Sequence, residues 1–174
     1  MSVDDCEHTF HELAHVVLPG YLKDLRQKMA FSVPMADFGI KGVGPVTLRR
    51  RFNLDKEPSG CHVLTDEGRP VYVGISRAVI TRLREHVLGT DHMTATLAYK
   101  IAATRHPHGM TATLAMEDRE FRLRFQESRD YLMGLSTAWV EIPNPLELYF
   151  FEPYCAMELG TGINMGGWNT FVTH

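Results

Sequence analysis

The sequence predicts an α+β protein built on a small antiparallel sheet of three strands flanked by helices. Two short apolar runs, residues 58–64 and 71–76, are separated by a turn sequence and favour a β-hairpin. An amphipathic helix over residues 75–87 follows the hairpin directly. Residues 138–142 (Ala-Trp-Val-Glu-Ile) predict the third strand.

The hairpin turn is expected at Asp66-Glu67-Gly68. These residues suit a three-residue loop with the glycine in the left-handed conformation. Such a loop pairs Thr65 with Arg69, and it places His62 opposite Tyr72. Because side chains alternate between the two faces of a strand, we expect the His62 and Tyr72 rings to be neighbours on one face.

The rest of the chain is predicted to be mainly helical. Residues 10–30 form a helix that is expected to break at Pro19-Gly20, a pair that ends helices. The last helix has a strong start signal at Asn144-Pro145 and runs to Leu159, with a kink or a split expected at Pro153. Two more helices are expected at residues 94–104 and 119–133. We expect residues 1–57 to form a helical N-terminal extension and residues 58–174 to form the main domain.

Composition limits the compartment and the partners. No apolar run approaches the roughly 20 residues of a membrane span, and the first residues are acidic where a signal peptide would be basic. The three cysteines are scattered without a CxxC pair, which favours reduced thiols. These features predict a cytoplasmic protein with no membrane partner.

The net charge of −3 argues against a protein that coats nucleic acid without specificity. The arginines are nevertheless grouped, and the groups could form a local basic face; they are residues 49–51, then 77, 82 and 84, then 119, 122 and 124.

Arg82 and His86 lie four residues apart in the helix expected over residues 75–87, and Ser76 is its expected N-cap. At about 100° per residue, both side chains lie at the edge of the apolar stripe, beside Ile75 and Val79. They therefore face whatever packs next to the helix rather than open solvent.

Taken together, these elements resemble the GIY-YIG nuclease domain. In that family one strand ends in Gly-Ile-Tyr, the next carries Tyr-Val-Gly or Tyr-Ile-Gly, and the following helix supplies an Arg and a His. Tyr72-Val73-Gly74 matches the second strand, and Arg82 with His86 matches the helix. Glu152, in the last helix, takes the place of the metal-binding Glu. The resemblance covers residues 58–174.

The family also has an Asn after that helix, and two residues compete for its place. Asn164 lies twelve residues after Glu152, which is the expected spacing. Asn169 begins Asn-Thr-Phe-Val-Thr-His174, which is similar to the ending of some bacterial members. We favour Asn169.

The first strand departs from the family, because Gly60-Cys61-His62 stands where Gly-Ile-Tyr is usual. His62 thus replaces the tyrosine that is assigned to the activation of water. A free imidazole, with a pKa of about 6.5, is a better base at neutral pH than a phenol with a pKa of about 10. The exchange leaves the role of residue 62 open but keeps its capacity to accept a proton.

The resemblance implies a metal-dependent endonuclease that hydrolyses phosphodiester bonds in nucleic acid, DNA in preference to RNA, with Mg²⁺ or Mn²⁺ bound by Glu152. The expected catalytic residues are His62, Tyr72, Arg82, His86, Glu152 and Asn169, and the expected substrate contacts are Gly74, Ser76, Arg77 and Asn164. We expect the first five catalytic residues to converge on one concave patch at one face of the sheet.

Two other functions fit parts of the sequence. The fold could serve as a nucleic-acid-binding module without catalysis. Residues His11-Glu12-Leu-Ala-His15 form the His-Glu-x-x-His pattern in which two histidines bind zinc and the glutamate is the base of a metalloprotease. Only ten residues precede His11, too few for the catalytic scaffold of such an enzyme. Ordinary structural roles, such as a helix cap for Glu152 or a surface cation for Arg82, compete with each assignment taken singly.

Overall fold

The structure is a computed structural model that describes residues 3–171. Its chain divides into two compact units. The first unit holds the residues up to Val33, then Lys56–Val79, and the residues from Ser136 onward; the second holds Pro34–Asp55 and Ile80–Leu135. The domain boundary that we expected between residues 57 and 58 stays a prediction. Within residues 3–171 we find no helix with both the length and the apolar character of a membrane span.

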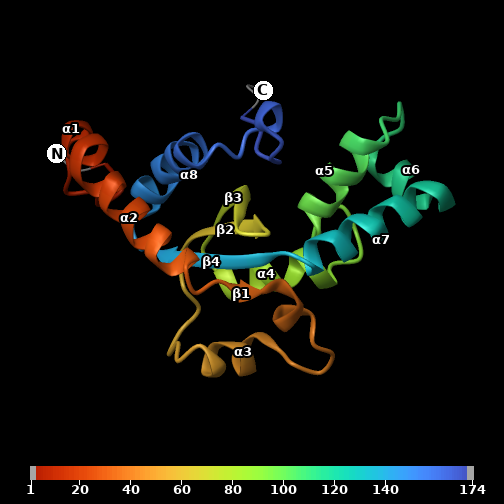
Figure 1. Cartoon of the computed structure of the whole chain (residues 1–174), viewed down its shortest axis with the longest axis horizontal. Helices are drawn as coiled ribbons and strands as arrows, with labels where there is room; N and C mark the ends of the chain where they lie inside the picture. The colour runs from red at the N-terminus through yellow and green to blue at the C-terminus, as the bar shows by residue number, and fades with distance from the viewer. Residues whose placement is uncertain (1–2, 172–174) are drawn as a thin grey trace. The chain divides into compact units, whose positions relative to one another are not determined.

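The sheet has four strands in the order β1-β4-β2-β3, one more than the sequence predicts (Figure 1). They are β1 (Val33–Pro34), β2 (Gly60–Asp66), β3 (Arg69–Ser76) and β4 (Ser136–Glu141). β2 pairs antiparallel with β3 on one side and with β4 on the other. The additional strand, β1, is only two residues long, too short to show the alternation that identifies a strand in a sequence.

The hairpin register differs from the expected one. Asp66 pairs with Arg69, so the turn has two residues, Glu67 and Gly68, both with positive φ (48° and 83°). Two left-handed residues match the twist of the flanking strands better than the three-residue loop that we expected. This turn moves the pairing by one residue from the expected register, and a bulge between the Leu64 and Thr65 pairs moves it by one more, so His62 lies opposite Gly74 rather than Tyr72. The two rings still share a face as diagonal neighbours, with centroids 6.1 Å apart.

The N-terminal helix is continuous through Pro19-Gly20, contrary to the expected break. It consists of α1 (Phe10–Glu12), a π-helical turn η1 (Leu13–Val17) and α2 (Leu18–Met29). A proline has no N–H to donate within a helix, and its ring crowds the preceding turn. Helices depart from regular α geometry at such positions, and a π-helical turn is one form of that departure. The wide turn ends just before Pro19, so the helix goes on where the sequence predicts a stop.

In the first unit, α2 and α8 (Pro145–Leu159) cover one face of the sheet (Figure 1). Their side chains pack against Cys61, Val63 and Val73, which lie on that face of β2 and β3. The α8 start signal is confirmed, because Asn144 Oδ1 accepts hydrogen bonds from the backbone N–H groups of residues 146 and 147 (2.9 and 3.0 Å). The helix ends at Gly160, in the left-handed conformation (φ 65°), and it is not split at Pro153.

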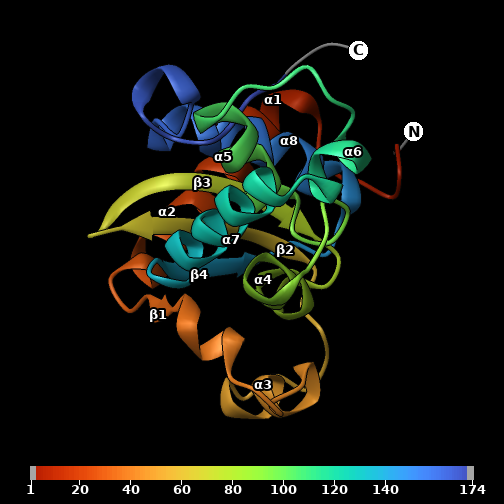
Figure 2. The same cartoon turned by 90° about the vertical axis from the view of Figure 1, so that its right-hand side faces the viewer.

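Apart from Pro34, the last residue of β1, the regular elements of the second unit are all helices, joined by loops. α5 and α6 both pack against α7 (Figure 2). The expected helices at 94–104 and 119–133 correspond to α5 and α7, whereas η2, α3 and α6 were not expected. The elements are η2 (Met35–Gly39), α3 (Pro45–Arg51), α4 (Val79–Leu88), α5 (Thr96–Arg105), α6 (Ala112–Glu117) and α7 (Arg119–Met133).

A buried carboxylate ties α2 to α8. Tyr21 Oη donates a hydrogen bond to Glu147 Oε2 (2.6 Å), and the Cys6 thiol lies 3.8 Å from the other oxygen. Glu147 is 6% exposed. Burial and the Glu147 partner raise the pKa of Tyr21 above its ordinary value of 10. This link therefore holds the N-terminal segment against the last helix.

We expect Tyr21→Phe to lower the free energy of unfolding by about 1.5–3 kcal/mol, because a buried carboxylate loses a donor. Because the folded-state pKa of Tyr21 is raised, its contribution should be complete below pH 10 and should be lost as the pH rises above 10. Urea unfolding at pH 8 and at pH above 10 measures both effects. Tyr154→Phe, on α8, is the matched control, and equal losses in the two variants would contradict the role of Tyr21.

Candidate active site

The hairpin brings His62, Tyr72 and Gly74 together. A Cβ atom on Gly74 would lie 2.9 Å from Cε1 of His62 and 2.9 Å from Cε1 of Tyr72, closer than real Cβ atoms come to other atoms. Glycine is therefore required at position 74 because the two rings occupy the space over it. His62 is buried, at 1% exposed, and Tyr72 is half-buried. The glycine of the Tyr-Val-Gly sequence is thus explained by the space that the two rings occupy. The substrate contact expected of Gly74 stays a prediction.

Asn169 supports the same strand from the side. Its Oδ1 accepts a hydrogen bond from the Val73 N–H, and its Nδ2 donates to the Val73 carbonyl, both at 2.8 Å. The residue is 7% exposed. Both ends of the amide are thus used to hold β3, the edge strand, so Asn169 positions Tyr72 and Gly74 on either side of Val73. Asn164 lies in η3 (Ile163–Met165) and is exposed. The last residues of the Asn169 sequence pattern, 172–174, lie outside the described part of the chain.

Glu152 lies on α8 and is half-buried. Burial raises the pKa of the Cys61 thiol well above its ordinary range; Cys155 and then the charge of Glu152 add to this shift. Glu152 is therefore close to Cys61, which occupies the face of β2 opposite to His62. We expected Glu152 to share one face of the sheet with His62 and Tyr72, but the helix that carries Glu152 covers the other face.

Arg82 and His86 come from α4, in the second unit. The Arg82 guanidinium donates to Glu85 Oε2 (3.1 Å) and to the Thr94 carbonyl (3.0 Å), and it also donates to the Thr96 hydroxyl. These bonds fasten α4 to the start of α5. His86 follows one turn later and is fully buried. Because this pair and the hairpin residues belong to different units, their convergence stays a prediction.

Ser76 and Arg77 directly follow the hairpin. Ser76 is the last residue of β3, and α4 begins at Val79 rather than directly after Ser76; the Ser76 hydroxyl oxygen instead accepts from the Ala78 N–H (2.9 Å). Both residues line a pocket of 300 Å³ between the end of β3 and the first turn of α8. Tyr149, which is 70% exposed, lines the same pocket. The only signal for Tyr149 in the sequence is its position, an aromatic residue three places before Glu152.

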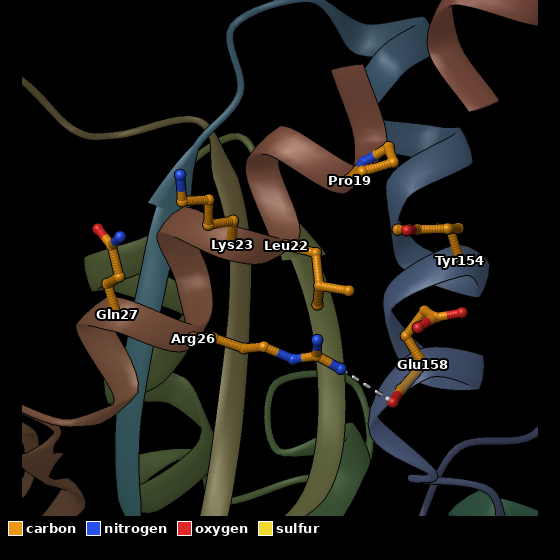
Figure 3. A pocket seen from close by; sticks show the side chains of 7 residues that line it. All are labelled: Pro19, Leu22, Lys23, Arg26, Gln27, Tyr154 and Glu158. Atoms are coloured by element: carbon orange, nitrogen blue, oxygen red, sulfur yellow. Dashed lines mark hydrogen bonds between the residues drawn. The ribbon is translucent and has the colours of Figure 1, made fainter. Parts of the chain in front are cut away.

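A second concavity lies between α2 and α8 (Figure 3). It has a volume of 450 Å³, and none of the predicted site residues lines it. Arg26 crosses the groove and donates to the backbone carbonyl of Glu158 (3.5 Å). Its lining residues are Pro19, Leu22, Lys23, Arg26, Gln27, Tyr154 and Glu158.

The His-Glu-x-x-His segment has a structural role at the start of the N-terminal helix. Glu12 accepts hydrogen bonds from the Thr9 N–H (2.7 Å) and the Thr9 hydroxyl (2.8 Å), and Thr9 caps the helix in return. These bonds lower the pKa of Glu12. The His11 and His15 rings lie 4.2 Å apart, and His15 Nδ1 donates to the His11 carbonyl (2.9 Å). Within residues 3–171, no three His, Cys, Asp or Glu residues form a group that could hold a metal ion. Glu12 is engaged as a capping residue, and this favours the structural role over the metalloprotease.

Comparison with protein-family models, curated proteins and solved structures finds no match to this chain.

Proposed function

We propose that this protein is a metal-dependent endonuclease of the GIY-YIG type, which hydrolyses phosphodiester bonds in nucleic acid, DNA in preference to RNA. The observation that carries the proposal is the packing of the His62 and Tyr72 rings over Gly74. The Tyr-Val-Gly sequence has its glycine because two proton-transferring side chains need the room beside it.

In this proposal His62 accepts the proton of the attacking water, and Tyr72 orients that water. Both side chains stand on adjacent strands, and Asn169 holds the outer strand through Val73. The imidazole is suited to the task because its ordinary pKa lies close to neutral pH. The order of the strands also matters, because β3 is the edge strand and, within residues 3–171, no further strand lies beyond Tyr72.

The remaining residues must reach the hairpin from two other elements. Arg82 supplies a permanent positive charge that can bind two oxygens of the scissile phosphate, and the fully buried His86 lies one turn later on the same helix. Glu152 lies on the helix that covers the opposite face of the sheet from His62. Its carboxylate must therefore reach the substrate past β3, the edge strand. The proposal requires the substrate to bind at this edge, beside the C-terminal segment whose Trp168 and Asn169 bond to the backbone of β3.

Glu152 is also the residue that would hold the metal. Mg²⁺ prefers oxygen ligands and keeps several of its waters, so one half-buried carboxylate is a sufficient protein ligand. The bound ion would stabilise negative charge on the phosphate and on the leaving oxygen.

Cleavage of supercoiled plasmid in Mg²⁺, in Mn²⁺ and in EDTA tests the proposal. We expect cleavage only with the metal, and we expect Glu152→Gln to lower the rate by at least about 10- to 100-fold, which is the loss caused by changing even the outer partners of a metal ligand. Glu158→Gln, on the same helix and exposed, is the matched control and excludes a contaminating nuclease. Equal rates in Glu152→Gln and Glu158→Gln would end the assignment of Glu152.

The second candidate is a GIY-YIG-like module that binds nucleic acid without cutting it. The three hydrogen bonds of Arg82 to its own unit favour this alternative, because they give the guanidinium a structural role. Binding that weakens steeply with salt, without cleavage in either metal, would support the module.

A further inference from the structure

The pocket between β3 and α8 combines three features that suit a nucleotide. Its body is apolar, formed by Ile75, Pro145 and Leu148. Arg77 provides a positive charge, and Tyr149 provides an aromatic ring that is 70% exposed. Its volume of 300 Å³ is at the lower end of the range for small-molecule sites, which suits one base with its sugar and phosphate.

The pocket also lies next to the proposed metal ligand. Leu148 precedes Glu152 by four residues and Tyr149 precedes it by three, so all three share one side of α8. Arg77 comes one residue after the end of β3, the strand that carries Tyr72 and Gly74. A nucleotide in this pocket would therefore neighbour the phosphate that the proposed site attacks.

We propose that this pocket binds an unpaired nucleotide that flanks the cleaved bond, with Tyr149 stacked on its base and Arg77 bound to its phosphate. The inference rests on the proposed function and names its substrate class: single-stranded DNA, or DNA with an unpaired nucleotide. In a continuous duplex both faces of each base are stacked on neighbours, so Tyr149 has no face to cover. An exposed aromatic ring binds any unpaired base, because every base has a π-face.

Fluorescence anisotropy in EDTA tests the inference without any need for cleavage. The probes are a labelled single-stranded oligonucleotide and a blunt duplex of the same sequence. We expect Tyr149→Ala to weaken single-strand binding roughly 5- to 100-fold, as the loss of one base stack does, and to leave duplex binding unchanged. Tyr149→Trp should retain the binding. Arg77→Gln should weaken it and reduce the slope of log affinity against log salt by about one.

Met157→Ala is the matched control, since Met157 is on the same helix and is 81% exposed. Single-strand binding by Tyr149→Ala that equals that of Met157→Ala would overturn the inference, even if the protein cleaves DNA. A preference for single strands that depends on Tyr149 would support it, even if no metal gives cleavage. If the wild type binds neither probe, both this inference and the proposed function fail.

Discussion

Arg82→Ala is expected to lower the rate of metal-dependent cleavage by about 100-fold or more, because a positioned cation no longer stabilises the charge that develops on the phosphate. Single-turnover rates on plasmid, measured well below the unfolding temperature, give the size of the loss. Arg82→Lys should recover only part of the rate, since an ammonium group keeps the charge but lacks the planar fork of the guanidinium.

The contacts of Arg82 make a second explanation possible, and two variants separate the explanations. The guanidinium fastens α4 to the start of α5 through Glu85, Thr94 and Thr96. Glu85→Gln and Thr96→Val remove partners of the guanidinium but leave its charge in place. If these variants lose as much rate as Arg82→Ala, Arg82 acts only by holding the loop, and its role at the phosphate is refuted. If they stay close to wild type, the charge itself is what the reaction needs.

Gly60→Ala is expected to lower the free energy of unfolding by several kcal/mol, a large part of the 5–15 kcal/mol that is typical of a small protein. A Cβ atom at position 60 would lie 2.0 Å from the carbonyl oxygen of Val140 and 3.1 Å from Cα of Glu141. Both are backbone atoms of β4, which pairs with β2 at this point. The strands would have to separate, because neither atom can rotate away as a flexible side chain can.

Gly20→Ala is the matched control for the same chemical change. Gly20 lies in α2, and a Cβ atom there would meet no atom within 4 Å. This substitution should raise the free energy of unfolding by about 0.5–1 kcal/mol, because alanine is the better helix former. Urea unfolding of both variants gives the comparison. Equal stability of the two would mean that β2 and β4 do not pair as described.

The local parts of the fold could be predicted from the sequence, and the parts that depend on distant contacts could not. Asn144-Pro145 and Gly160 mark the ends of α8 by the chemistry of their own side chains and backbone. The hairpin register depended on Glu67, which takes the left-handed conformation (φ 48°) although its residue type rarely does, and on a bulge between the Leu64 and Thr65 pairs. The continuity of the helix at Pro19 depended on a π-helical turn, for which the sequence carries no known signal.

The candidate site shows the same division. The residues of the hairpin and of α4 could be named from spacing and from the family resemblance. The requirement for glycine at position 74 could not be foreseen, because it arises from the His62 ring on the neighbouring strand. The hydrogen bonds between Asn169 and Val73 join residues 96 positions apart in the chain, a contact that no local pattern reports.

The contact of the C-terminal segment with β3 also affects how copies of this protein meet one another. An uncovered edge strand is a template on which a second chain can add a strand, which leads to domain swapping or aggregation. Here the Trp168 N–H bonds to the Val71 carbonyl (2.8 Å), and the Asn169 amide occupies both backbone groups of Val73. A chain shortened before Trp168 would expose these groups in a row. The segment therefore keeps the proposed substrate edge from being occupied by another molecule of the same protein.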